Sequence, residues 1–473
     1  MQKASVKKNI ILELDSFYLD RVVNWLSETQ FNLKYNIFVV IKTYNYQRFV
    51  DKLSQFSNVN CFTYEDIFSY QSELKLEPQE YYDFNKQFFN NHLTARFTDR
   101  SGYLPKYGIG IQNAFTNHSF SAYNTLLFLK DHNVDFMCFR NTPHNMKEWI
   151  LVSACEFLNI DIYTFEDFIF PWLFTIKKGC LNQTELVFEH LDFINKADLK
   201  AHIQKSVEIA SGDYEQAIPT YEKKRMGKGL FKFFNPFKNI KDSLVRPHQF
   251  LNRARNYYYY KKASKVIDLK QTEYIAFFLH FQPERSTLPE GYDFVDQFFT
   301  IKLLSLMLPD TVKLLVKEHP SMFTKISEPK FRSLHNYKLI EKLDNVEYVS
   351  MHMDSFSLID HSKAVVSTKG TVCLEAYMRQ KPVIMFGKTN LKNMHGVHNY
   401  NNINDLEQFI QDVIKDKISI HNVVEQLTEA CDKMASCGIT TKPENTSSYS
   451  FTREIREDAT YPLLTKLLQS KLN

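Results

Sequence analysis

The stretch that decides the fold runs from Val312 to Gly387, and its central part reads AVVSTKGTVCLE, from Ala364 to Glu375. Its apolar start is typical of a buried strand, and small hydroxyl residues, a glycine and a helical pattern follow it. A second apolar run, residues 312–316, ends in charged residues and a proline. Polar groups past the carboxyl ends of parallel strands face the crevice where open α/β sheets bind ligands, and a helix that starts there directs N–H groups at an anion. The stretch therefore predicts an α/β fold with a phosphate site.

The same alternation of apolar runs and helical patterns fills the second half of the chain. Its predicted strands are residues 274–281, 312–316, 346–349, 364–366 and 382–386, and its predicted helices are residues 293–308, 355–360, 371–379, 403–415 and 423–434. Crossovers of this length join parallel strands. Residues 271–450 are therefore predicted to form one Rossmann-like domain.

The first half repeats this pattern. Its predicted strands are residues 9–14, 36–41, 59–62, 134–139 and 160–163, and the predicted helices between and after them are residues 18–29, 45–56, 78–97, 119–131 and 146–158. Such alternation argues for a parallel sheet with helices on its faces, so residues 1–175 are predicted to form a second Rossmann-like domain. Residues 451–473 are predicted to hold a last helix at residues 453–472, which is amphipathic and is expected to pack back toward this N-terminal domain.

Composition narrows the class of protein. The chain has 473 residues, of which 44% are hydrophobic and 24% are charged, as in soluble proteins of two or three domains. Its seven cysteines form no CxxC pair, so neither a disulfide framework nor a zinc site is predicted. No apolar run approaches the roughly 18 residues of a spanning helix, and no secretion signal is visible. A cytoplasmic protein is expected.

Residues 223–265 differ from the rest of the chain in charge. They contain 13 Lys or Arg against the single acid Asp242, so the remaining residues carry a net charge of −8 while the whole chain carries +4. With their interleaved aromatic residues they are a candidate for docking on an anionic membrane surface or for holding a polyanionic glycan. The alternative is a solvated linker within a helical, basic connecting region, residues 176–270. No nucleic-acid motif accompanies the charge, so nucleic acid is not an expected partner.

The segment KEHP, residues 317–320, ends the strand at residues 312–316. Here His319 can donate to a phosphate oxygen while Pro320 fixes the turn, with Lys317 and Glu318 beside them. A histidine with a purely structural role is the alternative.

The segment that follows residues 364–366 adds to this chemistry. Gly370 permits close approach of the backbone, and Glu375 lies where a carboxylate can hold the two hydroxyls of a ribose. The other polar residues of the segment are Ser367, Thr368, Lys369 and Thr371, whose hydroxyls are also predicted to cap the helix. An ordinary β-turn-α unit is the alternative. The spacing matches neither GxGxxG nor GxxxxGK[ST], so neither a dinucleotide fold nor a P-loop is predicted.

Two further polar segments end predicted strands. In QPER, residues 282–285, Gln282 and Glu284 can bind a base or sugar, and Arg285 can pair with a carboxylate or phosphate; a polar turn is the alternative. In RNTPHN, residues 140–145, His144 is a site candidate. The alternative is a capped helix start with His144 exposed in its first turn.

The segments QPER, VKEHP, residues 367–375 and the following KPV together resemble bacterial capsule and surface-polysaccharide glycosyltransferases, the group that includes capsule β-Kdo transferases. The resemblance covers residues 274–399 well and the N-terminal half loosely. It implies two Rossmann-like domains in a GT-B-like arrangement, in which the C-terminal domain holds a cytidine-activated sugar. The residues expected to bind the nucleotide are Gln282, Arg285, Lys317, Glu318, His319, Ser367, Thr368, Lys369, Gly370, Thr371 and Glu375.

The resemblance thus implies a metal-independent glycosyltransferase that moves a Kdo-like acidic sugar from a CMP donor to a glycan or lipid-linked acceptor, and the basic segment places it at the inner face of the cytoplasmic membrane. No cofactor besides the donor is expected. The candidate catalytic residues are His144, Asp135, Glu148 and Glu284. Two alternatives are a polyol-phosphate transferase that uses CDP-glycerol and a non-catalytic, membrane-docked assembly protein.

Overall fold

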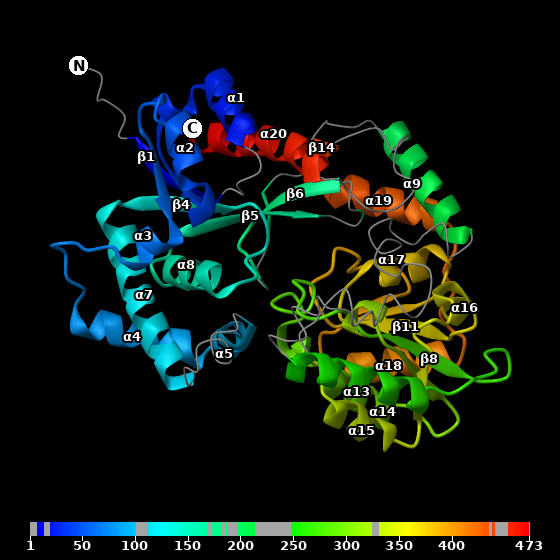
Figure 1. Ribbon diagram of the computed structural model, residues 1–473. Coiled ribbons are helices and arrows are strands. Elements are labelled where there is room, and N and C mark those ends of the chain that lie inside the picture. Colours follow the sequence, from blue (N-terminus) through cyan, green and yellow to red (C-terminus); the bar gives the residue numbers. More distant parts are fainter. Residues whose placement is uncertain are drawn as a thin grey trace.

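The computed structural model describes residues 7–13, 19–100, 111–167, 170, 173–181, 185–187, 196–212, 247–323, 331–434, 438–439 and 453–472. It contains two sheets, each with helices packed on its faces, in two bodies that lie side by side (Figure 1). The fold is therefore α/β with two Rossmann-like domains, as the sequence predicts.

The N-terminal sheet has the strand order β14-β6-β5-β4-β1-β2-β3, and β7 pairs with β6. Its strands are β1 (Lys8–Glu13), β2 (Tyr35–Ile41), β3 (Val59–Thr63), β4 (Val134–Phe139), β5 (Asp161–Asp167), β6 (Leu173–Lys178), β7 (Glu185–Leu186) and β14 (Gly438–Ile439). The strands β1 to β5 pair in parallel, whereas β6, β7 and β14 pair antiparallel. The order of the parallel strands reverses between β1 and β4, so the crevice of this domain lies at their carboxyl ends.

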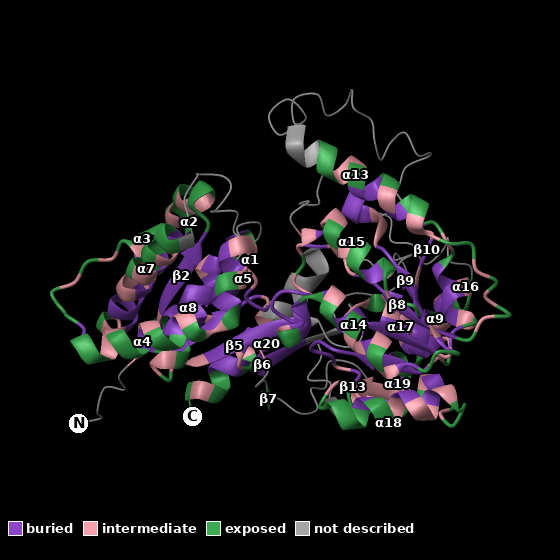
Figure 2. Ribbon diagram, turned by 90° about the horizontal axis from the view of Figure 1, so that it is seen from below, coloured by how far each residue is buried: buried purple, intermediate pink, exposed green. Residues whose placement is uncertain are grey.

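Helices cover both faces of this sheet because side chains of a strand alternate between its faces. In β4, Phe136 and Cys138 belong to one buried cluster, and Met137 and Phe139 belong to the other. The helices are α1 (Leu19–Thr29), α2 (Tyr46–Leu53), α3 (Tyr64–Phe68), α4 (Pro78–Asn90), α5 (His92–Arg100), α7 (Ile111–Asp131), α8 (Met146–Phe157) and α20 (Arg453–Leu472), with short 3-10 turns at η2 (Phe31–Leu33) and η3 (Thr43–Asn45). Figure 2 shows the strands buried and the outer faces of the helices exposed.

The C-terminal sheet is entirely parallel and has the order β10-β9-β8-β11-β12-β13. Its strands are β8 (Tyr274–Phe278), β9 (Lys313–Lys317), β10 (Val346–Val349), β11 (Ala364–Ser367), β12 (Val383–Met385) and β13 (Val397–Asn399). Its helices are α14 (Gln297–Met307), α15 (Leu334–Glu341), α16 (Ser355–Asp360), α17 (Thr371–Met378), α18 (Ile403–Ile414) and α19 (Val423–Met434), with 3-10 turns η5 (Tyr292–Val295) and η6 (Pro320–Phe323). This is the 3-2-1-4-5-6 order of doubly wound sheets, whose ligand crevice lies where the order reverses, between β8 and β11.

The structure describes only part of the predicted connecting region, residues 176–270. The boundary predicted at residue 175 falls inside β6. Within the predicted connecting region, α9 (Lys196–Ser211) and α13 (Pro247–Ala263) pack on the C-terminal domain, where Tyr257 and Tyr260 are buried in the core. The basic residues 223–246 lie outside the described residues. Where the chain is described, we find no helix with both the length and the apolar character needed to cross a membrane.

The last helix, α20, packs on the N-terminal domain although the C-terminal domain precedes it in sequence (Figure 1). Its apolar residues Leu463, Leu464, Leu467 and Leu468 are fully buried in the same cluster as α1. The indole of Trp25 donates to the hydroxyl of Thr465 at 2.9 Å. The N-terminal domain is therefore built from two separate parts of the chain.

Candidate functional site

Polar residues at the ends of β8 and β11 meet where the order of the C-terminal strands reverses. Ser367 donates its hydroxyl to the carbonyl of Phe278 at 2.9 Å and lies 3.0 Å from Nε2 of His280. The backbone N–H of Lys369 donates to the same Nε2 at 3.1 Å. Because Nε2 accepts this hydrogen bond, a neutral His280 carries its proton on Nδ1, which lies 3.7 Å from Oε2 of Glu284.

Gly370 forms the turn between β11 and α17. Its φ of +147° lies in a region that residues with a side chain rarely adopt, and a Cβ there would approach Cε1 of His280 to 2.6 Å. No side chain caps the helix that begins at Thr371, whereas the sequence predicted hydroxyl caps. The first turn of α17 therefore leaves backbone N–H groups available to an anion.

The neighbouring hydroxyl of Thr368 is fully buried, and its Oγ1 has no hydrogen-bond partner among the described residues. The carbonyl of Thr368 accepts from the backbone N–H of Gly387 at 2.6 Å, which fixes the turn against the end of β12. Thr371 is exposed, and Glu375 is half-buried one turn further along α17. An unpartnered buried hydroxyl costs about 1–3 kcal/mol, which a bound ligand can offset.

The carboxylate of Glu290 joins this turn to the N-terminal domain. It accepts from Nζ of Lys369 at 2.7 Å and lies 3.4 Å from Nε of Arg285. Thr142, which follows β4 of the other domain, donates its hydroxyl to Glu290 at 3.1 Å. Arg285 also donates to Oδ1 of Asn141 at 3.4 Å. The ends of β4 and β11 are thus brought to one place.

A second carboxylate, Glu166 at the end of β5, lies beside the first. It forms a buried ion pair with Lys388 of the C-terminal domain and lies 3.3 Å from Nζ of Lys177. Burial alone raises the pKa of Glu166, but the charges of Lys388, Lys177 and Lys369 outweigh it and lower that pKa to about 2. Burial lowers the pKa of Lys177, although Glu166 partly offsets this. Lys177 also reaches Oδ1 of Asn390 at 2.8 Å.

We call this set the seam cluster. Its charged members are Glu166, Lys177, Arg285, Glu290, Lys369 and Lys388, and Thr142 belongs to it as the bridging hydroxyl. With all groups ionised, four cations face two carboxylates, which leaves a net charge of +2 at the ligand edge of both sheets. Buried positive charge without a counter-charge costs free energy. An anion that binds here would neutralise this charge and would therefore be bound favourably.

The end of β9 carries the His-Pro segment. Nζ of Lys317 donates to the carbonyl of Met353 and to the hydroxyl of Ser355, each at 2.6 Å, so it anchors the loop before α16. Nδ1 of His319 accepts from the backbone N–H of Ser321 at 3.2 Å. A neutral His319 therefore carries its proton on Nε2 and can donate from that atom. A contact of His319 or Lys317 with a phosphate stays a prediction.

Arg332 ties the ends of β8 and β9 together. Its guanidinium donates to Glu318 at 2.9 Å, to Oε1 of Gln282 at 3.1 Å and to the carbonyl of His280 at 2.9 Å. Glu318 is fully buried and also accepts from the hydroxyl of Tyr337 at 2.7 Å. Gln282 and Glu318 thus hold the strand ends in position, and a direct contact with a nucleotide stays a prediction for both.

Glu284 lies on the half-exposed turn that follows β8. Its carboxylate accepts from the hydroxyl of Ser286 at 2.9 Å, and its carbonyl accepts from Arg100 of the N-terminal domain at 3.4 Å. Burial opposes ionisation of Glu284, but the neighbouring His280 and the hydrogen bond from Ser286 hold its pKa below the usual value. Glu284 is therefore an ionised carboxylate at neutral pH and a weak base.

The structure separates the catalytic candidates of the N-terminal domain. Nδ1 of His144 lies 3.2 Å from the carbonyl of Thr142 and 3.4 Å from Oε2 of Glu148, so it stands next to the seam cluster. Glu148 is buried and accepts from the backbone N–H of His144 at 2.6 Å, as a helix-capping carboxylate does. Asp135 is the second residue of β4 and accepts from the N–H of Asn9 at 2.7 Å. Because β4 begins at the edge opposite to its carboxyl end, Asp135 lies away from the other candidates.

Several residues of the site were not among the predicted ones: His280, Glu290, Glu166, Lys388, Lys177 and Arg332. His280 and Lys388 follow the ends of β8 and β12, so the strand-end pattern contained a signal for both. Glu166 was missed because the strand was expected to end at residue 163, whereas β5 extends to Asp167. Glu290 and Arg332 lie in irregular segments, where no periodic pattern marks them.

Comparison with solved structures gives only loose overlaps. A β-Kdo 2,4 transferase, KpsC of Thermosulfurimonas dismutans, matches with 9% identity and a TM-score of 0.32, over 63% of this chain and 79% of that one. A putative UDP-N-acetylglucosamine 2-epimerase from Listeria monocytogenes matches with 10% identity and a TM-score of 0.25, over 92% and 93%. We draw no argument from scores this low. Among curated proteins, no sequence matches.

The comparison with protein families is decisive. The family described as capsule polysaccharide biosynthesis protein matches residues 159–421, which is more than half of the chain. The match includes every strand of the C-terminal sheet, the turn after β11 and all charged members of the seam cluster. The chain therefore belongs to the family of capsule polysaccharide biosynthesis proteins.

Proposed function

We propose that this chain is a glycosyltransferase that moves an acidic sugar, Kdo or a close relative, from a cytidine nucleotide to a glycan or lipid-linked acceptor. The observation that carries the proposal is the anion site at the β8/β11 crevice. There the uncapped start of α17, the open backbone at Gly370 and the surplus charge of the seam cluster meet. The membership in a capsule polysaccharide family supports a sugar nucleotide as the source of that anion.

The leaving phosphate needs neutralisation as the sugar develops oxocarbenium character. We assign this task to Lys369, His319 and the backbone of residues 367–371, with Glu375 holding the ribose. Glu284, which stays ionised, is placed to stabilise positive charge on the sugar. His144, oriented by Glu148 3.4 Å away, is the candidate base for the acceptor hydroxyl. No metal is assigned a role in this scheme.

The acceptor side of the proposal includes the membrane. Lipid-linked acceptors are held at an anionic surface, and residues 223–265 carry 13 basic residues against one acid. Each basic side chain near such a surface contributes about 1 kcal/mol to binding. We therefore assign this segment to reversible docking at the inner face of the cytoplasmic membrane.

Calorimetric titration of the purified protein with CMP, CDP, UDP and GDP tests the proposal. We expect CMP to bind at least tenfold more tightly than UDP and GDP, and turnover with CMP-Kdo but not with CDP-glycerol. Turnover with CDP-glycerol alone would instead identify a polyol-phosphate transferase. A folded protein that binds none of the four nucleotides would identify a non-catalytic assembly protein.

A further inference from the structure

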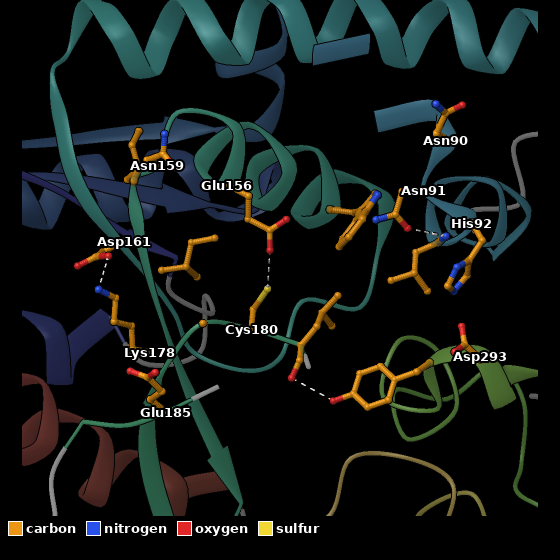
Figure 3. A pocket seen from close by; sticks show the side chains of 17 residues that line it. Asn90, Asn91, His92, Glu156, Asn159, Asp161, Lys178, Cys180, Glu185 and Asp293 are labelled. Atoms are coloured by element: carbon orange, nitrogen blue, oxygen red, sulfur yellow. Dashed lines mark hydrogen bonds and ion pairs between the residues drawn. The ribbon is translucent and has the colours of Figure 1, made fainter. Parts of the chain in front are cut away.

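A cavity of about 1000 Å³ lies apart from the β8/β11 crevice, between the end of α4, α5, the end of α8, the strands β5 to β7 and the η5 turn of the C-terminal domain. We call it the polar groove and define it by Asn90, His92, Glu156, Asp161, Glu185 and Asp293. Figure 3 shows these side chains around one opening, with Asp293 contributed by the C-terminal domain. Both domains therefore contribute to the groove.

The groove keeps much of its hydrogen-bonding capacity unused. Within the described part of the chain, the side chains of Asn90, His92, Glu185 and Asp293 make no hydrogen bond or ion pair, and all four are exposed. Glu156 contacts the thiol of Cys180 at 3.9 Å, which is a weak donor. Amides supply donors and acceptors, and carboxylates supply acceptors. This combination suits a ligand that is rich in hydroxyl groups.

Charge decides which hydroxyl-rich ligand fits. Four carboxylates line the groove against one lysine, Lys178, which already pairs with Asp161 at 2.6 Å. Burial raises the pKa of Glu156. Even without Glu156, three carboxylates face one lysine, so the groove is negatively charged and a polyanion or a nucleotide is disfavoured. A metal ion is also disfavoured, because the described residues contain no group of three or more His, Cys, Asp or Glu arranged to hold one. Among hydroxyl-rich ligands, a glycan of neutral or amino sugars therefore fits the groove best.

The groove extends away from the seam cluster. Asp161 and Glu166 lie five residues apart on β5, which at about 3.3 Å per residue places them roughly 16 Å apart. At the near side, Tyr292 donates to the carbonyl of Leu181 at 3.0 Å and follows Glu290 of the seam cluster by two residues. A ligand that reaches from the cluster into the groove is therefore longer than one sugar ring.

We infer that the polar groove binds an oligosaccharide of neutral or amino sugars, as the stretch of the acceptor glycan remote from the reacting end. This inference rests on the proposed function. The two sites then sort the substrates by charge, because the cationic seam cluster receives the anionic donor and the anionic groove receives the uncharged acceptor chain. A volume near the upper end of the usual range for ligand sites fits a chain of sugars better than a single ring.

The test is a glycan array that carries neutral, amino-sugar and acidic oligosaccharides of one to six units, probed with the full chain. We expect neutral or amino-sugar chains of three or more units to be retained and the acidic ones not. Hits are then titrated by calorimetry against the variant Asn90→Ala/His92→Ala/Asp293→Ala, which changes three exposed groove residues. The matched control is Gln87→Ala/His335→Ala/Asp310→Ala, which changes exposed residues outside the groove. We expect at least a fivefold loss of affinity in the groove variant only.

Three outcomes would overturn the inference: no retained oligosaccharide, retention of acidic chains alone, or unchanged binding by the groove variant. A lysine-rich peptide that binds the groove more tightly than every oligosaccharide would also overturn it, in favour of a protein partner. CMP titration of the same variants separates this inference from the proposed function. Glycan binding that depends on the groove, without any nucleotide binding, would refute only the transferase assignment.

Discussion

Lys388 at the end of β12 and Glu166 at the end of β5 form an ion pair that joins the C-terminal to the N-terminal domain, and both side chains are less than a tenth exposed. These residues are 222 positions apart in sequence. Glu166 also balances Lys177, so one carboxylate serves two buried cations. The seam between the domains is therefore held by charge as well as by packing.

We expect Glu166→Gln to destabilise the protein by about 3–5 kcal/mol, because Lys388 and Lys177 would stay buried without their counter-charge. Urea unfolding followed by tryptophan fluorescence measures the loss. Adding Lys388→Met should recover part of it, and Glu73→Gln, at an exposed position, is the control. A loss equal to that of the control would show that the pair contributes nothing to stability.

The same carboxylate predicts how stability depends on pH. The seam cluster lowers the pKa of Glu166 from its ordinary 4.5 to about 2, so the unfolded chain binds the proton more readily than the folded one. The stabilisation is therefore complete above about pH 4.5 and is lost as the pH falls toward 2. Melting temperatures of the parent protein and of Glu166→Gln should converge over this window. Curves that stay parallel from pH 6 to pH 2.5 would contradict the prediction.

Gly370→Ala should weaken CMP binding and lower the melting temperature. The added Cβ meets the ring of His280, and the φ of +147° is unfavourable for alanine. The double variant Gly370→Ala/His280→Gly removes the clash but keeps the backbone strain, so it should recover only part of the melting temperature. Full recovery would show that crowding alone makes glycine necessary.

His319→Ala should lower CMP affinity by roughly 10-fold to 150-fold, because one charge-assisted contact to phosphate contributes about 1.5–3 kcal/mol. Calorimetry measures the change. The control His335→Ala alters an exposed histidine on α15 and should bind CMP normally. If both variants bind CMP with the same affinity, His319 does not contact the nucleotide.

Reversing Lys223, Lys224, Arg225 and Lys228 to Glu should reduce sedimentation with anionic liposomes, since attraction of basic residues to the surface becomes repulsion. Turnover of a lipid-linked acceptor should fall, and turnover of a short soluble acceptor should not. Equal losses on both acceptors would place this segment in the acceptor site instead. If the parent protein does not sediment with anionic liposomes at low salt, residues 223–265 are better described as a linker.

The sequence predicted most of the parallel strands well, but it missed β13 at the edge of the C-terminal sheet and the antiparallel edge of the N-terminal sheet. The predicted strand at residues 134–139 coincides with β4, and the last helix was predicted at its observed bounds, 453–472. By contrast, β6 was missed because buried Thr175 and Lys177 break its apolar pattern. Lys177 is buried because it forms an ion pair with Glu166 on the neighbouring strand. A pattern along one strand cannot reveal a partner on another.

The same limit explains which residues of the candidate site could be predicted from the sequence. Ser367 ends β11 and Gly370 lies three residues further, so local pattern finds them, whereas the contact of Thr142 with Glu290 spans 148 residues and two domains. Local pattern also gives no sign that the amine of Lys317 donates to Met353 and Ser355 in the loop before α16. Residue type and position after a strand predict a crevice, but only the packed chain decides which side chains face it.

The return of α20 to the N-terminal domain has a consequence for synthesis on the ribosome. Trp25 and Leu26 are made early, yet Leu463, Leu464 and Leu467, which cover them, are made after the whole C-terminal domain. Domains usually fold in the order in which they emerge. Here the C-terminal domain can complete its core first, while the apolar face of α1 stays uncovered until translation has passed residue 468. The nascent N-terminal half thus exposes this apolar face throughout synthesis of the C-terminal domain.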